Sequence, residues 1–250
     1  MRNKLFSLLF CMTVTLPAAA ETISVAVAAN VQYVFDDLKA AFKQETGHEA
    51  QGVFNSSGKF VAQISNGAPF DVFLSADMEF PEKLYRDGFT TAAPKVYASG
   101  ALVLWSSKSR DWQQWQQLLS SAAITRIALA NPKTAPYGRE AMKMLKTLGL
   151  DAAVQSKLVF GESISQTNQY IDSGLVDLGF TAKSVVLSPQ MQGHGSWVEM
   201  PKSAYEPIAQ GAVLLNYGRQ HHAQAAQQFY DFMYSAKARA ILQRYGYLLP

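Results

Sequence analysis

Short apolar runs alternate with stretches of helical periodicity along most of the chain. The run ISVAVAA at 23–29 predicts a buried strand, because it is a continuous stretch of small and branched apolar residues. The next segment predicts an amphipathic helix that begins with Asn30 as its N-cap and ends at Gly47. Its apolar face is formed by Val31, Val34, Phe35, Leu38 and Phe42. Strands at 50–54 and 71–76, with a second helix between them, complete the first group of elements.

The middle of the chain repeats this order of strands and helices. Strands are predicted at 101–105, 126–130, 157–160 and 176–181, and helices at 112–119, 138–148 and 163–171. A polar, glycine-rich stretch follows near 192–196, and AVLLN at 212–216 predicts a late strand. We then expect one long amphipathic helix from His221 to Arg244.

The alternation predicts an α/β protein with two lobes, each a mostly parallel sheet flanked by helices. We place lobe 1 at residues 21–100 plus 207–250 and lobe 2 at residues 101–206. The chain is expected to cross between the lobes near 98–101 and near 205–210. Two crossings leave a cleft between the lobes, and clefts of this kind are favoured ligand sites.

Residues 1–20 have the pattern of a secretory signal peptide. Arg2 and Lys4 precede an apolar core at 5–16, and three alanines ending at Ala20 supply the small residues of a cleavage site. The core is too short to span a bilayer as a helix. We therefore expect export to the periplasm and cleavage after Ala20.

Composition and charge exclude several kinds of partner. Removing Arg2 and Lys4 from the 22 basic residues leaves 20 against 19 acidic residues, a formal net charge of +1. This balance argues against nucleic acid as a partner. The single cysteine, Cys11, would leave with the signal peptide, so no disulfide is expected. The histidines have no H-E-x-x-H spacing, and we expect neither a directly bound metal nor a cofactor.

The stretch FNSSGKF at 54–60 could belong to several chemistries. A P-loop is excluded, because Val53 stands where its first glycine belongs and Phe60 stands where Ser or Thr would hold magnesium. A periplasmic hydrolase that uses Ser57 and His194 stays an alternative, although the G-x-S-x-G elbow is absent. The remaining histidines, His48, His221 and His222, are expected on the solvated surface.

A third interpretation of FNSSGKF is an anion site at the start of a helix. Ser56 and Ser57 follow a strand and precede a helix, whose first N–H groups and dipole attract negative charge. The same order recurs at Asn30, at 135–138 and at 161–164, each at the carboxyl end of a strand. Ordinary helix capping is the alternative explanation of these residues. Lys59 is expected to point to solvent, and Glu162 to complement a helix N-terminus.

Several segments of the chain resemble the periplasmic molybdate-binding proteins of ABC importers. They are VAVAAN, FNSSGK, GAPFDVFLSAD, NPKTAPYGREA and the closing RYGY. The resemblance covers the whole mature chain and implies a type II periplasmic binding fold with its ligand in the interlobe cleft. It implies a monomeric, non-enzymatic receptor that captures molybdate, and also tungstate, and delivers it to an inner-membrane permease with a cytoplasmic ATPase. A receptor for sulfate or another oxyanion, the hydrolase, and a scaffold protein with a vestigial cleft stay open.

The resemblance also implies which residues bind the oxyanion. Asn30 and Ser57 match ligand positions of the family, and Tyr137 and Ile164 match positions that contribute backbone N–H groups. These residues would contact the metal only through the oxygens of molybdate. Several relatives have a tyrosine where this chain has Ala182, and we suggest that the Tyr137 hydroxyl replaces it.

Overall fold

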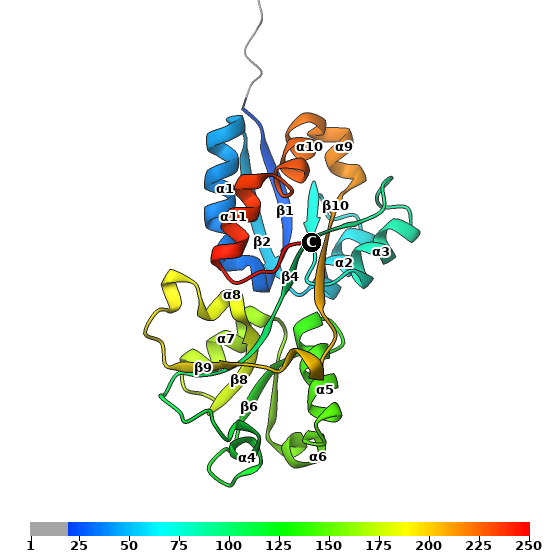
Figure 1. Cartoon of the computed structure of the whole chain (residues 1–250). Helices are drawn as coiled ribbons and strands as arrows, with labels where there is room; N and C mark the ends of the chain where they lie inside the picture. The colour runs from blue at the N-terminus through cyan, green and yellow to red at the C-terminus, as the bar shows by residue number, and fades with distance from the viewer. Residues whose placement is uncertain (1–19) are drawn as a thin grey trace, which may run out of the picture.

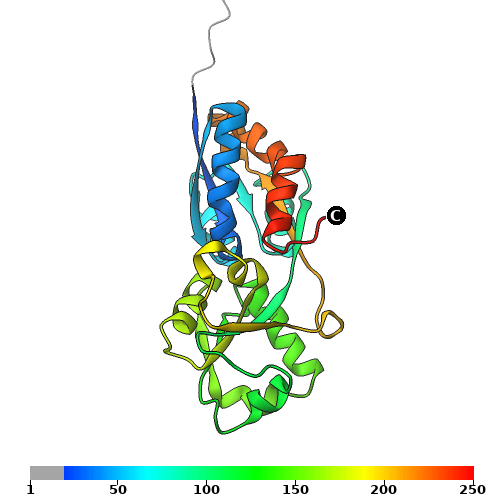
Figure 2. The same ribbon diagram turned by 60° about the vertical axis from the view of Figure 1, so that its left-hand side comes forward.

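The computed structural model describes residues 20–250, so the predicted signal peptide lies outside the described residues except for Ala20. These residues form two α/β lobes, one above the other, joined by extended segments (Figures 1 and 2). Each lobe is built around its own sheet of five strands. Across residues 20–250, no helix combines the length and apolar character needed to cross a membrane.

Lobe 1 contains the sheet β2-β1-β3-β10-β4. Its strands are β1 (Thr22–Ala28), β2 (Glu49–Asn55), β3 (Val72–Leu74), β4 (Lys95–Gly100) and β10 (Ile208–Leu214). Its helices are the 3-10 turn η1 (Ala29–Val31), α1 (Gln32–Thr46), α2 (Ser57–Ser65), α3 (Glu79–Arg86), α9 (Asn216–His221), α10 (Ala223–Phe232) and α11 (Ala236–Arg244). Val25 and Val27 pack under α1, α10 and α11, whereas Ala26 faces α2 and α3. Helices therefore cover both faces of the sheet.

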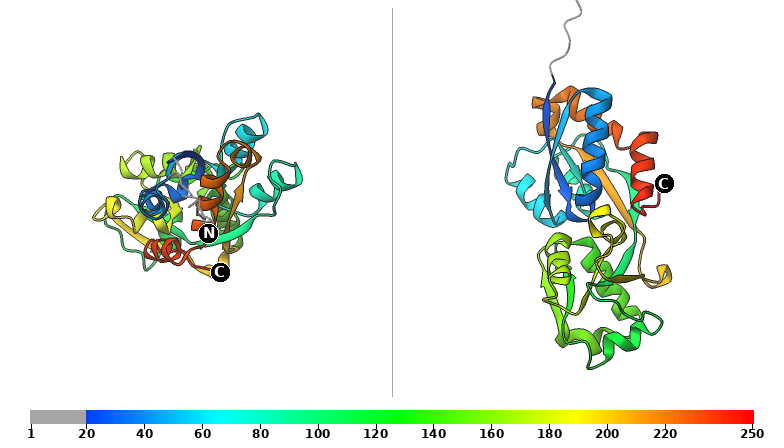
Figure 3. Two further views of the ribbon diagram at one scale, coloured as in Figure 1. Left: turned by 90° about the horizontal axis from the view of Figure 1, so that it is seen from above. Right: turned by 90° about the vertical axis from the view of Figure 1, so that its left-hand side faces the viewer.

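Lobe 2 contains the sheet β7-β6-β8-β5-β9. Its strands are β5 (Leu102–Ser106), β6 (Ile127–Ala130), β7 (Leu158–Gly161), β8 (Leu178–Ala182) and β9 (Ser196–Glu199). Its helices are α4 (Trp115–Ser120), α5 (Pro136–Thr147), α6 (Asp151–Val154), α7 (Ile164–Asp172) and α8 (Lys183–Val186), with 3-10 turns η2 (Gln155–Lys157), η3 (Pro189–Met191) and η4 (Lys202–Ala204). Helix α8 lies against lobe 1 (Figure 3).

The sheets are mixed, which refines the expectation of mostly parallel sheets. In each lobe three neighbouring strands run parallel, as the alternation of strands and helices predicts. Strand β10 runs antiparallel to β3 and β4, and β5 runs antiparallel to β8 and β9. The antiparallel strands lie where the chain passes between the lobes, because a returning segment enters its sheet from the opposite direction.

The expected single helix from His221 to Arg244 is wrong, because three helices occupy residues 216–244. His222 leaves helical geometry, and its Nδ1 lies 2.8 Å from Oδ1 of the buried Asp71. Ser235 is extended, and its hydroxyl accepts a hydrogen bond from the Ala238 N–H at 3.1 Å. Apolar periodicity runs through both breaks, so the pattern alone does not reveal them.

The solvated position expected for His48 is also wrong. Its side chain is buried beside Phe42, and Nδ1 accepts a hydrogen bond from the Glu21 N–H at 3.0 Å. His222 is half-buried, whereas His221 is exposed as expected. A polar ring can be buried where a backbone donor faces it, and the sequence does not show that donor.

The cap of α11 gives a direct test of this segment. We expect Ser235→Ala to lower the free energy of unfolding by about 0.5–2 kcal/mol, because the Ala238 N–H loses its acceptor. Chemical denaturation of this variant, with Ser173→Ala as control, measures the effect. The exposed Ser173 hydroxyl contacts only a carbonyl at 3.4 Å, so its loss should be close to neutral. Equal effects of the two substitutions on the free energy of unfolding would contradict the assignment of Ser235 as the N-cap of α11.

Candidate oxyanion site

A small cavity lies between the lobes, at the carboxyl ends of strands from both sheets. Its wall consists of Ala28, Ala29, Asn30, Ser56, Ser57, Ala76, Ala135, Pro136, Tyr137 and Ile164. The space between atoms there, counting the part that is open to solvent, is about 200 Å³. None of these lining residues is charged. The four residues proposed from the sequence, Asn30, Ser57, Tyr137 and Ile164, all line this one cavity.

Four helical segments begin at this cavity. Turn η1 begins at Ala29 and α2 at Ser57 in lobe 1, and α5 begins at Pro136 and α7 at Ile164 in lobe 2. The first N–H groups of a helix have no intrahelical acceptor, and the helix dipole adds partial positive charge there. Proline has no N–H, so Tyr137 carries the first backbone donor of α5. The cavity is therefore surrounded by donors suited to an anion.

Ordinary capping explains just one of these four starts. The Ser163 hydroxyl caps α7 by accepting from the Gln166 N–H at 3.4 Å. Neither Ser56 nor Asn30 makes a side-chain cap bond, and Ala135 has no polar side chain. The expectation that Asn30 caps the first helix is thus wrong, because its side chain is engaged elsewhere.

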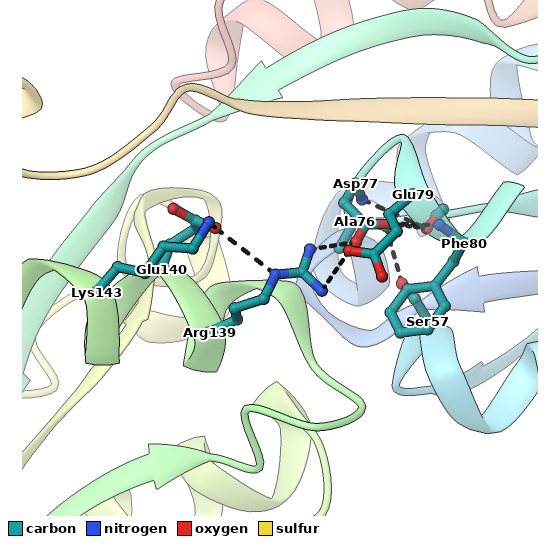
Figure 4. Close-up of polar contacts among 9 residues, drawn as sticks. Ser57, Ala76, Asp77, Glu79, Phe80, Arg139, Glu140 and Lys143 are labelled. Carbon is teal, nitrogen blue, oxygen red and sulfur yellow. Dashed lines mark hydrogen bonds and ion pairs between the residues drawn. The ribbon is translucent and has the colours of Figure 1, made fainter. Parts of the chain in front are cut away.

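The two serines of FNSSGKF have different surroundings. The Ser57 hydroxyl is fully buried and accepts a hydrogen bond from the Ala76 N–H at 3.0 Å, which leaves its own hydrogen free to donate (Figure 4). The Ser56 hydroxyl oxygen is buried and has no partner among the described residues. Ser57 was predicted as a ligand residue and Ser56 was not, although both line the cavity. The adjacent hydroxyls of Ser56 and Ser57 in FNSSGKF were the feature of the sequence that could have indicated both residues.

Asn30 belongs to a buried network behind the cavity. Its Nδ2 donates to Gln210 Oε1 at 2.9 Å and to the Tyr247 hydroxyl at 3.1 Å. Its backbone oxygen accepts from the hydroxyls of Ser184 at 2.8 Å and of Tyr247 at 3.0 Å. Ser184 lies two residues beyond Ala182, the position at which the family resemblance implies a tyrosine. The network therefore fixes Asn30 from both lobes.

The Tyr137 hydroxyl faces the same network. It accepts a hydrogen bond from Gln210 Nε2 at 3.1 Å and lies against Gly100. Desolvation by burial raises the pKa of Tyr137 well above its ordinary value, so the hydroxyl keeps its proton. These contacts give the hydroxyl a role in the network, and its replacement of the missing tyrosine as a ligand stays a prediction.

Ion pairs connect the lobes outside the ring of lining residues. Arg139, in the first turn of α5, lies 2.5 Å from Asp77 and 3.1 Å from Glu79 of lobe 1 (Figure 4). Lys59 of α2 lies 2.6 Å from Glu162 of lobe 2. The expectation that Lys59 points to solvent is therefore wrong, because an acidic residue of the other lobe lies within its reach.

Asp77 is buried at the centre of the first ion pair. Desolvation raises its pKa above the ordinary value, although hydrogen bonds from Arg139, the Phe80 N–H and the Ser75 hydroxyl oppose the rise. Desolvation lowers the pKa of Arg139, but the neighbouring carboxylates outweigh it and the net direction is upward. The Arg139 guanidinium thus favours the charged form of the buried Asp77 carboxyl.

The hydrolase alternative is wrong. His194 lies 2.8 Å from Asp172, both side chains are exposed, and His194 does not line the cavity. The Ser57 hydroxyl accepts from the Ala76 N–H, and within residues 20–250 no histidine is hydrogen-bonded to it. Within residues 20–250, no group of three His, Cys, Asp or Glu side chains is arranged to hold a metal ion.

Comparison with known proteins bears on the family and the fold. The chain matches the family model for bacterial extracellular solute-binding proteins over residues 23–248. It is 42% identical to the molybdate-binding protein ModA of Azotobacter vinelandii over 231 residues, covering 92% of this chain and 91% of that protein. It is 38% identical to ModA of Rhodobacter capsulatus, covering 97% and 94% of the two chains. The solved periplasmic molybdate-binding protein of Azotobacter vinelandii superposes with a TM-score of 0.85 at 36% identity, covering 91% and 99%. The two-lobed fold predicted from the sequence is confirmed.

The dependence of Asp77 on Arg139 predicts a pH-dependent loss of stability. Arg139→Met leaves the buried carboxylate without its cation, so we expect the free energy of unfolding to fall by about 1–3 kcal/mol at pH 7. A carboxyl whose folded pKa is raised is stabilising when protonated, and this contribution is lost as the pH rises through that pKa. The difference in free energy of unfolding between the wild type and Arg139→Met should therefore shrink as the pH falls toward about 4.

Denaturant titrations at neutral and acidic pH measure this deficit. Arg86→Met is the matched control, because Arg86 lies 3.9 Å from Glu82 on an exposed helix surface and should contribute little. A deficit for Arg139→Met that stays constant between the two pH values would contradict the account.

Proposed function

The chain belongs to the bacterial extracellular solute-binding proteins, and within them to the ModA molybdate-binding proteins, and we propose that it binds molybdate in the interlobe cavity for delivery to an ABC importer. The observation that carries the proposal is the cavity wall, which joins four helical N-termini and contains no charged residue. Such a wall fits a small anion that is held by hydrogen bonds alone.

Molybdate matches the polarity of this wall. It is a tetrahedral dianion at neutral pH, and its oxygens accept hydrogen bonds but donate none. Five donors are identified on the wall: the backbone N–H groups of Ser57, Tyr137 and Ile164, and the hydroxyls of Ser56 and Ser57. At about 1.5–3 kcal/mol each, they would contribute roughly 8–15 kcal/mol, against the about 8 kcal/mol of micromolar binding. Hydrogen-bond free energy beyond that needed for micromolar binding offsets the cost of removing water from the anion and of closing the lobes.

The same wall disfavours protonated phosphate. That anion carries a hydrogen that needs an acceptor, and a carboxylate is the usual one. Glu162, the acidic residue closest in sequence to the α7 start, is exposed and paired with Lys59. Sulfate has the charge of molybdate but shorter bonds, so a rigid cavity holds it more loosely. Tungstate has nearly the size of molybdate, and we propose that it binds as well.

Transport depends on the two lobes closing on the ligand. We propose lobe boundaries at 21–100 plus 207–250 and at 101–206, with the ligand bridging Asn30 and Ser57 of one lobe to Tyr137 and Ile164 of the other. A ligand that bridges both lobes stabilises the closed arrangement through its higher affinity for it. The permease then recognises the closed shape. We further propose a monomer in the periplasm, exported with a signal peptide that is removed after Ala20.

A ligand panel tests the proposed function. Thermal unfolding with millimolar molybdate, tungstate, sulfate, phosphate or no addition should show a large upward shift in Tm for the first two, because they bind the folded state. A comparable shift with sulfate would instead favour a sulfate receptor. No shift with any of these anions would contradict the proposal.

The serine hydroxyls test where the anion binds. Each of Ser56→Ala and Ser57→Ala removes one charge-assisted hydrogen bond, and we expect a loss of about ten- to a hundredfold in molybdate affinity by calorimetry. Ser65→Ala, at the exposed end of the same helix, is the control and should bind as the wild type does. Wild-type affinity in both cavity variants would place the anion elsewhere.

A further inference from the structure

A fully buried glutamine, Gln210, lies at the centre of the network behind the cavity. Its Oε1 accepts from Asn30 Nδ2 at 2.9 Å and from the Tyr97 hydroxyl at 2.8 Å. Its Nε2 donates to the Tyr137 hydroxyl at 3.1 Å. Tyr97 belongs to β4 of lobe 1 and Tyr137 to α5 of lobe 2, so Gln210 contacts both lobes from the crossing strand β10.

The amide of Asn30 is left with an unpaired oxygen in this arrangement. Both hydrogens of Nδ2 are used, one by Gln210 and one by Tyr247. Oδ1 is buried and has no partner among the described residues, while Asn30 itself lines the cavity. An unpaired buried acceptor is destabilising, and it repels the oxygens of an anion beside it.

We propose that Gln210 is a positioning residue that turns the donor side of the Asn30 amide toward the bound oxyanion. The inference rests on the proposed function, because it assumes that the cavity holds molybdate. The two amides rotate together by 180° about their terminal bonds. Asn30 Oδ1 then accepts from Gln210 Nε2, and Asn30 Nδ2 donates into the cavity.

The rotated arrangement keeps the groups of the network paired, provided that the Tyr247 hydroxyl turns its hydrogen from the Asn30 backbone oxygen to Oδ1; the backbone oxygen then keeps its bond from the Ser184 hydroxyl. Gln210 Nε2 donates its two hydrogens to Asn30 Oδ1 and to the Tyr97 hydroxyl, which in turn donates to the Ser75 oxygen that it already contacts at 3.2 Å. Gln210 Oε1 accepts from the Tyr137 hydroxyl. Each tyrosine hydroxyl can serve as donor or acceptor, so apart from the two amides only hydroxyl hydrogens have to turn.

The two amides are coupled, because neither can turn alone. Rotation of Asn30 by itself would place Oδ1 against Gln210 Oε1, and rotation of Gln210 by itself would place Nε2 against Asn30 Nδ2. Either change sets two like groups 2.9 Å apart. Gln210 therefore determines whether Asn30 presents an acceptor or a donor, and a bound acceptor-only anion selects the donor.

Two substitutions of Gln210 separate orientation from packing. Gln210→Met keeps the length of the side chain and leaves the Asn30 amide unoriented, so we expect about tenfold weaker molybdate binding. In Gln210→Glu the ionised carboxylate accepts from Asn30 Nδ2 and holds Asn30 Oδ1 toward the anion. We therefore expect this variant to lose more molybdate affinity than Gln210→Met does. Thr181→Val is the matched control: it removes a buried hydrogen bond to Asn168 within lobe 2 and should leave affinity unchanged.

The side-chain amide of Asn30 reports its orientation without any destabilising change. In ¹⁵N-labelled wild-type protein, molybdate should move one Asn30 side-chain amide hydrogen strongly downfield, because it enters a charge-assisted bond. Asn30→Ala identifies the resonance. In Gln210→Met the molybdate-induced shift should be smaller.

The outcomes distinguish this inference from the proposed function. If the wild type binds molybdate but its Asn30 amide resonances stay in place, or if Gln210→Met binds as the wild type does, the positioning role is overturned and molybdate binding stands. If the wild type fails to bind molybdate, the proposed function falls and this inference falls with it.

Discussion

The proposed binding of molybdate depends on one electrostatic constraint: an ion with two negative charges must be enclosed by groups that carry no full positive charge. Burial of an unpaired charge is very unfavourable unless fixed dipoles replace its hydration. The fold meets this constraint by ending parallel strands of both lobes at one cavity, so that the helices after them begin there. Gly138 permits the close approach in lobe 2, since a Cβ at this position would lie 1.9 Å from the Ala130 oxygen.

The cations of the interlobe region serve a different purpose. Arg139 and Lys59 contact acidic residues of the opposite lobe rather than the cavity, so they join the lobes without entering the wall. The Gly58 N–H, in the first turn of α2, donates to the Thr134 oxygen of lobe 2 at 2.9 Å and adds a neutral link between the lobes. Arg139, Lys59 and Gly58 thus link the lobes without lining the cavity, whereas Asn30 and Tyr137 do both.

Much of the fold could be predicted from the sequence, because apolar runs and helical periods mark elements whose sides are buried. The breaks at His222 and Ser235 could not, since they depend on contacts with Asp71 and with a backbone N–H. For the site, strand ends followed by helix starts predicted four segments, and the family resemblance singled out Asn30, Ser57, Tyr137 and Ile164 within them. Gln210, Tyr247 and the Arg139–Asp77 pair were missed, because their partners meet only after folding: Arg139 and Asp77 are 62 positions apart, and Asn30 and Tyr247 are 217 positions apart.

A crystal structure of the molybdate-loaded protein tests the central claim most directly. The account predicts a tetrahedral ion in the interlobe cavity, with its oxygens about 2.7–3.2 Å from the backbone nitrogens of Ser57, Tyr137 and Ile164. It also predicts that Arg139 and Lys59 keep their carboxylate partners. A lysine or arginine nitrogen within hydrogen-bonding distance of the ion, or an ion bound outside this cavity, would contradict it.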